Sequence, residues 1–192
     1  MVIPVQIAVI GLLGAAYYGY HAVKGEPEAK PDATSRTATA TPTPSPTPEV
    51  ATKRLVSKKG KFAVGVPENL EAKKVGPAIT MMSTDKVLSV VVAPVESGKI
   101  SVSSKAFMKG MNAAYTNVKV TRTENQMIDG NKAKATYGTA KNAKKLQLRF
   151  VNIVIKSTRR NFAINAFTAS NADPLFVVSR VNAIANTFEV IK

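Results

Sequence analysis

The pattern of hydrophobic and polar positions changes twice along the chain and divides it into three zones. Residues 2–23 carry no charged side chain and consist mostly of Val, Ile, Leu, Ala and Gly. Residues 25–52 are rich in Pro and Thr and show no apolar periodicity. Residues 53–192 combine strand-like and helix-like periods, which is typical of a folded domain. We therefore expect an anchor (1–24), a linker (25–52) and one globular domain (53–192).

Strand-like alternation begins at the start of the third zone. Segment 61–67 places every second side chain, from Phe62 onward, on one apolar face and ends at a proline. Segments 78–83 and 87–95 are apolar and β-branched around a polar turn, so they predict a hairpin. We expect Pro94 to break or bulge the second strand of this hairpin, because proline cannot donate to a ladder.

The second half of the domain repeats this alternation. The segments are 118–123, 132–139, 146–155 and 161–169. Between the first two lies Asp129-Gly130, a dipeptide that favours a tight hairpin turn. Residues 146–155 are apolar on both alternations, which is typical of a central strand that is covered on both faces.

Two further segments follow the helical period. Residues 103–115 have apolar side chains at helical spacing, and Ser103 or Ser104 is placed to cap the first turn. A second helix is expected to begin at Asp173-Pro174, because Asp is a favoured N-cap and Pro a favoured first residue. Its apolar stripe consists of Val177, Val181, Ile184 and Phe188. Together these elements predict an α+β fold, an antiparallel β-sheet flanked by helices in an α/β/α sandwich.

The third zone is strongly basic and poor in catalytic side chains. It holds 24 of the 27 Lys and Arg residues but 8 of the 12 Asp and Glu residues, an excess of 16 positive charges, and it has no Cys, Trp or His. A catalytic Ser–Lys pair of Ser103 or Ser104 with Lys105 is disfavoured, because helix capping accounts for the serine. The glycines match no phosphate-binding motif. We therefore expect a protein that is not an enzyme and has no cofactor, no metal and no small-molecule substrate.

The basic side chains are the remaining functional signal. We expect them to bind lipid headgroups, an anionic envelope polymer or an acidic protein; nucleic acid is less favoured because stacking aromatics are scarce. Lys132 and Lys134 share one strand face, and Lys119 on the preceding strand is expected to extend it. The open alternative is a generally cationic surface with no single target. The candidate residues are Lys58, Lys59, Lys119, Lys132, Lys134, Lys141, Lys144, Lys145, Arg159 and Arg160.

The first zone predicts a membrane anchor. An apolar helix needs about 20 residues to cross the hydrocarbon core, and residues 2–23 are long enough. A cleaved signal peptide is the alternative, but no Lys or Arg precedes the apolar run and the run is longer than a signal core. We expect a single-pass protein of the cell membrane.

The side of the membrane on which the domain lies is a second expectation. Lys24, Lys30 and Arg36 follow the apolar run, which by the positive-inside rule indicates a cytoplasmic domain. The Pro/Thr-rich residues 25–52 are instead typical of a disordered, semi-rigid spacer before an exported domain. We expect the domain to be extracytoplasmic; the alternative is a binder of nucleic acid or acidic protein at the cytoplasmic face.

The order of these landmarks resembles the PsbP/Mog-type α/β/α sandwich, which includes PsbP-like and LpqN-type envelope proteins of bacteria. The features are the opening strand Phe62–Pro67, the hairpin, the helix after a Ser-rich loop, the turn at Asp129-Gly130 and the closing helix that ends in Ile184-Ala-Asn-Thr-Phe188. The resemblance covers residues 55–192. It implies a mostly non-catalytic accessory or binding role. The histidines that some PsbP-like proteins offer as metal ligands are absent from this domain.

Overall fold

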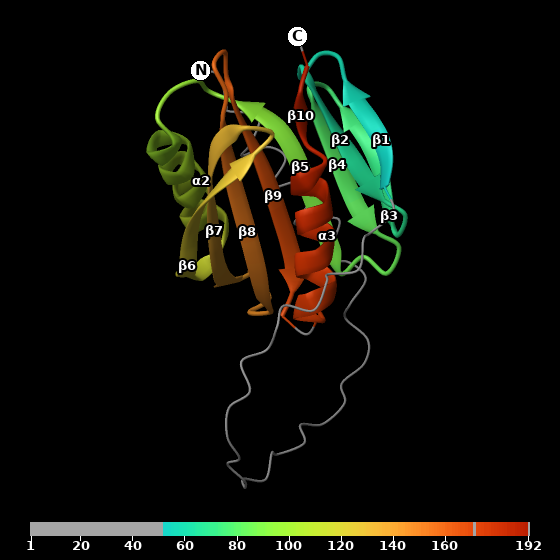
Figure 1. The fold of residues 1–192 in the computed structure, drawn as a ribbon. Helices are drawn as coiled ribbons and strands as arrows, with labels where there is room; N and C mark the ends of the chain where they lie inside the picture. Colours follow the sequence, from blue (N-terminus) through green and yellow to red (C-terminus); the bar gives the residue numbers. More distant parts are fainter. Residues whose placement is uncertain (1–51, 171, 192) are drawn as a thin grey trace, which may run out of the picture.

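The computed structural model describes residues 52–170 and 172–191, which form two antiparallel sheets and two helices (Figure 1). The strands of the large sheet, in the order in which they lie side by side, are β3 (Leu70–Val75), β4 (Ala78–Ser83), β5 (Leu88–Val95), β9 (Asn161–Ala169), β8 (Gln147–Lys156), β7 (Asn131–Lys141) and β6 (Thr116–Ile128). The small sheet contains β1 (Thr52–Ser57), β2 (Phe62–Pro67) and β10 (Glu189–Val190), and the helices are α2 (Ile100–Ala114) and α3 (Pro174–Asn186).

The two faces of the large sheet are covered differently. Helix α2 lies on one face, against β8, β7 and β6, and α3 lies on the other, against β9 (Figure 1). Strand β2 contacts α3 and β3, so the small sheet completes the layer that α3 begins. The expected α+β arrangement of an antiparallel sheet between helices is therefore present, with a small sheet added to one outer layer.

Three phenylalanines join the layers on the α3 side. Phe62 begins β2, Phe162 lies in β9 and Phe188 follows α3, and each is at most 1% exposed. Their ring centroids are 5.2 to 5.8 Å apart. Aromatic pairs at such distances add about 0.5–1.5 kcal/mol to the free energy of burial, so this cluster fixes the small sheet and α3 against the large sheet.

A smaller core holds α2 against the opposite face. Phe107 and Met111 of the helix pack on Leu148 and Phe150 of β8. The ring of Phe150 lies over Gly138 of the neighbouring strand, and a Cβ at that glycine would overlap the ring. Glycine is therefore required at this position for the second core to close.

Most elements expected from the sequence are confirmed. The hairpin of β4 and β5, the interior strand β8 and the beginning of α3 at Pro174 lie where the pattern predicts them. Asp129 and Gly130 connect β6 and β7 with φ angles of 49° and 66°, as a tight turn with left-handed residues requires. The apolar stripe of α3 is buried.

Two local predictions are wrong. Strand β5 continues through Pro94, which pairs in register with Phe162. The ladder with β4 has already ended at Val92, so on that side no neighbour requires a donor from the proline. Helix α2 begins earlier than expected, after the N-cap Lys99, without a side-chain cap. The hydroxyl of Ser103 instead accepts a hydrogen bond from Asn161 Nδ2 at 3.3 Å.

Three strands were not predicted, and each lacks an alternating apolar pattern. Strand β1 begins with exposed Thr52, Lys53 and Arg54, and β3 is exposed at most of its positions. Strand β10 is two residues long. All three lie at the edge of a sheet, where one side of the strand remains in solvent and the burial signal is weak.

The predicted anchor and linker, residues 2–23 and 25–52, lie outside the described residues apart from Thr52. In residues 52–170 and 172–191, no helix is long and apolar enough to cross a membrane.

Candidate anion-binding groove

A groove of about 580 Å³ separates α2 from strands β6 and β7. Lys105 and Lys109 reach it from α2, where their spacing of four residues places them on one side of the helix. Lys134 reaches it from β7. We call this site the basic groove; its lining consists of Ser101, Ser104, Lys105, Met108, Lys109, Asn112, Val120, Thr123, Lys134 and Thr136.

The three lysines of the basic groove are not neutralised by acidic side chains. Lys105 and Lys109 are exposed and Lys134 is half-buried. Two ion pairs of the described residues lie elsewhere: Arg54 with Glu189 at 2.7 Å, and an arginine–glutamate pair within β6 at 3.1 Å. The groove therefore presents a net positive potential to a ligand, strongest where the lysines face each other across it.

Two buried side-chain oxygens near these lysines have no hydrogen-bond partner among the described residues. Ser104 Oγ is buried and has no hydrogen-bond partner among the described residues. Thr136 is buried beside Asn152 of the adjoining strand, and the side-chain oxygen of Asn152 also has no partner in the described part of the chain. A buried polar atom without a partner costs about 1–3 kcal/mol, so such atoms mark a place for a ligand or an ordered water.

Five of the ten candidate residues predicted from the sequence gather at one end of the sheet. Lys58 and Lys59 lie in the β1–β2 turn, Lys132 is the second residue of β7, and Arg159 and Arg160 connect β8 to β9. Two hydrogen bonds from backbone amides of the chain end bring the first two of these turns together: Ile191 N–H donates to the carbonyl of Lys61, and Val190 N–H donates to the carboxylate of Asp129.

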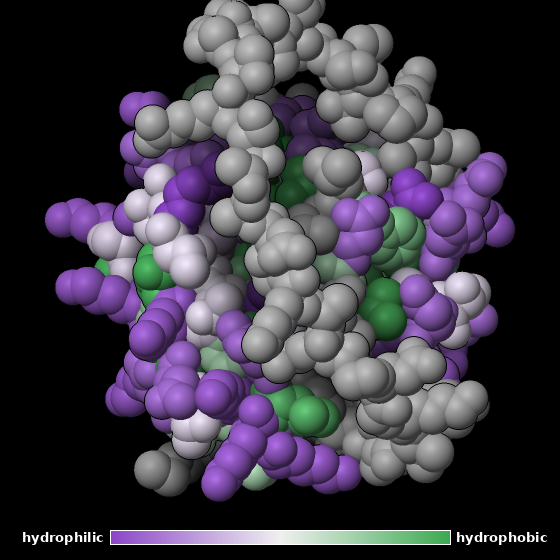
Figure 2. Space-filling model, turned by 90° about the horizontal axis from the view of Figure 1, so that it is seen from below, coloured by the Kyte–Doolittle hydropathy of each residue, from purple (hydrophilic) through white to green (hydrophobic). Residues whose placement is uncertain are grey.

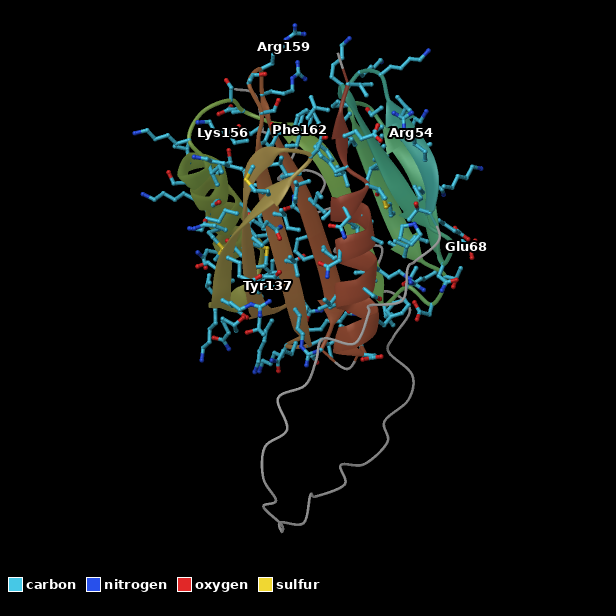
Figure 3. All side chains as sticks on the ribbon, in the orientation of Figure 1. Arg54, Glu68, Tyr137, Lys156, Arg159 and Phe162 are labelled. Atoms are coloured by element: carbon cyan, nitrogen blue, oxygen red, sulfur yellow. The ribbon has the colours of Figure 1, made fainter. Side chains whose placement is uncertain are left out.

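Two exposed lysines join this set, and Figure 3 shows one of them, Lys156, at the same end of the molecule as Arg159. We call the set the cationic end; it consists of Lys58, Lys59, Lys61, Lys132, Lys156, Arg159 and Arg160. Lys132 precedes Lys134 by two positions on the same face of β7, so the cationic end continues into the basic groove.

Three other candidates lie at the opposite end of the sheet. Lys141 ends β7, and Lys144 and Lys145 belong to its connection to β8. Figure 2 shows this end from below, with hydrophilic side chains around its rim and hydrophobic side chains in a few places between them. These lysines do not join the cationic end.

The expectation for Lys119 is wrong. In a regular ladder it would lie opposite Ala140 and share the face of Lys134. A register shift between Val120 and Arg122 adds a residue to β6, so Lys119 pairs with Thr139 on the opposite face. A one-residue shift exchanges the faces of a strand, and the sequence carries no clear signal for this bulge.

Lys105 and Lys109 occupy the position expected of Lys119, on the α2 side of the groove. Sequence reasoning missed both as binding residues. Their four-residue spacing within the predicted helix 103–115 was the available signal, because it places two lysines on one helix face.

The structure does not assemble catalytic groups from the weak pairs in the sequence. Ser104 and Lys105 are neighbours on a helix, and successive helical side chains do not face each other. Ser103 Oγ already accepts the hydrogen bond from Asn161. Among the described residues, no group of three or more Asp, Glu, His or Cys side chains could hold a metal ion.

Both tyrosines of the described residues are engaged within the fold. Tyr115 stacks on Phe167 with ring centroids 6.4 Å apart, and burial raises the pKa of its phenol above 10.0. Tyr137 lies under the guanidinium of Arg122, 4.4 Å from its ring centroid. Neither ring lines the basic groove, so neither offers a stacking platform for a base there.

Comparisons with known proteins identify the fold. No protein-family model matches the chain, and no curated protein matches it in sequence. The solution structure of cyanobacterial PsbP (CyanoP) from Synechocystis sp. PCC 6803 is similar over 73% of this chain and 93% of that chain, with a TM-score of 0.57 and 14% identity.

The crystal structure of LpqN, a protein involved in cell envelope biogenesis of Mycobacterium tuberculosis, is also similar. The similarity covers 74% of this chain and 92% of that chain, with a TM-score of 0.54 and 9% identity. The resemblance to PsbP-like and LpqN-type proteins is thereby confirmed for the fold. At these identities the likeness extends to architecture alone.

Proposed function

We propose that this protein is a non-catalytic accessory module of the cell envelope, held at a membrane by residues 2–23, which binds an anionic partner. The basic groove is the binding site, and the cationic end attracts and orients the partner. The domain lies outside the cytoplasm at the end of the Pro/Thr-rich spacer. The fold it shares with an envelope-biogenesis protein supports this compartment.

The observation that carries the proposal is the set of three lysines around buried hydroxyl groups. Lys105, Lys109 and Lys134 have no acidic partner in the described residues, and Ser104 Oγ beneath them has no hydrogen-bond partner. A phosphate-rich ligand would supply what both lack, because its oxygens accept hydrogen bonds from ammonium and hydroxyl groups alike.

A phosphate-rich polymer fits this site better than a nucleic acid. Binding of a single strand commonly uses aromatic side chains on which bases stack, and neither tyrosine of the described residues lines the basic groove. Lysines and hydroxyls instead bind phosphate without regard to a base.

The proposal is tested by titrating the full-length protein, in neutral detergent, with fluorescently labelled inorganic polyphosphate. We expect binding that weakens steeply with salt, because exposed charges are screened beyond about 10 Å at 0.1 M ionic strength. Replacing Lys105, Lys109 and Lys134 together by Gln should weaken binding about tenfold or more.

The matched control replaces Lys53, Lys73 and Lys74 by Gln, which removes the same charge from strands far from the groove. We expect this variant to bind within about twofold of the wild type, since only long-range attraction changes. Equal losses in the two variants would show that net charge alone attracts the polymer, and absence of binding at low salt would refute the proposal.

A further inference from the structure

A second groove lies on the other face of the sheet and has a different character. It has a volume of about 470 Å³ and separates α3 from the strands β6 and β7. Val177 and Val178 of α3 form one wall, and Val178 is 47% exposed. We call this site the apolar groove. Its volume lies within the range of about 300–1,000 Å³ that is usual for small-molecule sites.

The floor of the apolar groove consists of two rows of side chains across the sheet. Tyr137, Val151 and Ala166 occupy paired positions on β7, β8 and β9, so they form an apolar row. The next row toward the β7–β8 connection is polar: it consists of Thr139, Arg149 and Thr168, which also occupy paired positions. Apolar surface therefore gives way to a guanidinium between two hydroxyl groups.

Arg149 is the informative member of the polar row. It is half-buried, and within residues 52–170 and 172–191 it has no ion-pair partner. Arg122 at the rim of the same groove differs, because it pairs with Glu124 at 3.1 Å and lies over the ring of Tyr137. A guanidinium presents a planar fork of donors that matches carboxylate and phosphate. The apolar groove therefore suits a ligand that joins an anionic group to an apolar chain.

We propose that the apolar groove binds an amphiphile that consists of one apolar chain ending in a carboxylate or phosphate. Arg149 binds the anionic end, with the hydroxyls of Thr139 and Thr168 beside it. The chain lies on Val151 and Ala166 along α3. The ligand is bound and not converted, and its recognition does not depend on the basic groove, which is on the other face. A bound small molecule departs from the expectation drawn from the sequence.

The test uses the full-length protein and a long-chain fatty acid that carries a photoreactive diazirine. After illumination, peptide mapping should place the label on α3, β7 and β8. Dodecanoate should displace the probe, whereas dodecanol, which lacks the charge, and acetate, which lacks the chain, should not. The proposal would be overturned if dodecanol displaced the probe as effectively as dodecanoate does. It would also be overturned if acetate, which lacks the chain, displaced the probe.

Arg149→Gln should raise the dodecanoate concentration needed for half-displacement roughly tenfold to a hundredfold, as the loss of a hydrogen-bonded charge pair implies. Arg54→Gln is the matched control, because it makes the same change at an exposed position of β1 in the small sheet, and it should have no effect (Figure 3). If half-displacement of the probe required the same dodecanoate concentration in the wild type and in Arg149→Gln, the proposal would be contradicted.

A second variant guards against misfolding of Arg149→Gln. Val178→Asp places a charge on an exposed wall of the groove without touching the core, and it should abolish labelling of α3 and β7. Replacing the three lysines of the basic groove should leave labelling unchanged, so failure of this inference is distinguishable from failure of the proposed function. Labelling of Val178→Asp at the wild-type level would refute the site.

Discussion

The buried amide pair beneath α2 gives a sharp test of how polar groups are held in this core. Asn152 of β8 and Asn165 of β9 are 1% and 3% exposed, and the Nδ2 of Asn152 donates to the Oδ1 of Asn165 at 2.7 Å. The other amide atom of Asn152, Oδ1, has no partner among the described residues. Asn165→Leu removes the acceptor and leaves the whole amide of Asn152 unsatisfied.

The magnitude follows from the cost of an unsatisfied buried group, which is about 1–3 kcal/mol. Asn165→Leu and Asn152→Leu should each lower the free energy of unfolding by about 2 kcal/mol, because each leaves the partner amide buried without its hydrogen bond. The double variant buries neither amide and replaces both by apolar side chains of similar size. We expect it to be within about 1 kcal/mol of the wild type, a coupling of about 3 kcal/mol.

Urea denaturation of the four proteins measures this cycle. With a slope of about 1–3 kcal/mol/M, a change of 2 kcal/mol moves the midpoint by roughly 1 M. Asn182→Leu, on the exposed surface of α3, is the control and should change stability by less than about 0.5 kcal/mol. If the double variant lost as much as the two single variants together, the pair would not be coupled and our account of this site would fail.

Three further predictions concern the core and its pH dependence. Phe188→Ala should destabilise the domain by about 3–5 kcal/mol in urea, because it empties the aromatic cluster that joins the three layers; a loss below 1 kcal/mol would contradict this. Gly138→Ala should cost about 1–3 kcal/mol, because its Cβ would overlap the Phe150 ring and the carbonyl oxygen of Lys119, and Phe150→Leu in the same chain should recover only the part of the loss that comes from the ring; simple addition of the two effects would exclude the overlap with the ring. Burial raises the pKa of Tyr115, so the folded state holds its proton more tightly than the unfolded state, and stability falls as pH rises through and above 10.0. Between about pH 9 and about pH 11, Tyr115→Phe should lose less stability than the wild type in thermal unfolding, and equal losses would show that this phenol contributes nothing.

The sequence was sufficient for the elements that bury an apolar face. The pattern around Phe62 and the stripe that ends at Phe188 predicted β2 and α3, because burial imposes a period of two on a strand and 3.6 on a helix. Strands β1 and β3 escaped prediction since their outer positions are polar and their pairing depends on neighbours distant in the chain. Edge strands have little local signal of their own.

The basic character of the candidate site could be predicted from the sequence, but its position in the fold could not. Lys134 was identified, and the basic excess is a property of composition alone. Lys105 and Lys109 complete its groove only because α2 packs across β7, which no local pattern states. The bulge in β6 carries Lys119 to the other face, and a shift of one residue is set by tertiary packing. The count of charged residues therefore predicted that the site is basic, whereas the packing of the elements determines which basic side chains lie together.

An excess of positive charge does not by itself locate a function, because exposed lysines are satisfied by water. The informative groups are those whose surroundings withhold a partner that their chemistry requires. Ser104 Oγ in the basic groove is buried without a hydrogen-bond partner among the described residues, and Arg149 in the apolar groove is half-buried without an ion-pair partner among them. The two groups lie on opposite faces of the sheet. Strand β7 lines both grooves, with Thr136 on one face and Thr139 on the other. Because side chains of a strand alternate between its faces, one strand contributes to a polyanion site and to an amphiphile site, and the two sites have no side chain in common.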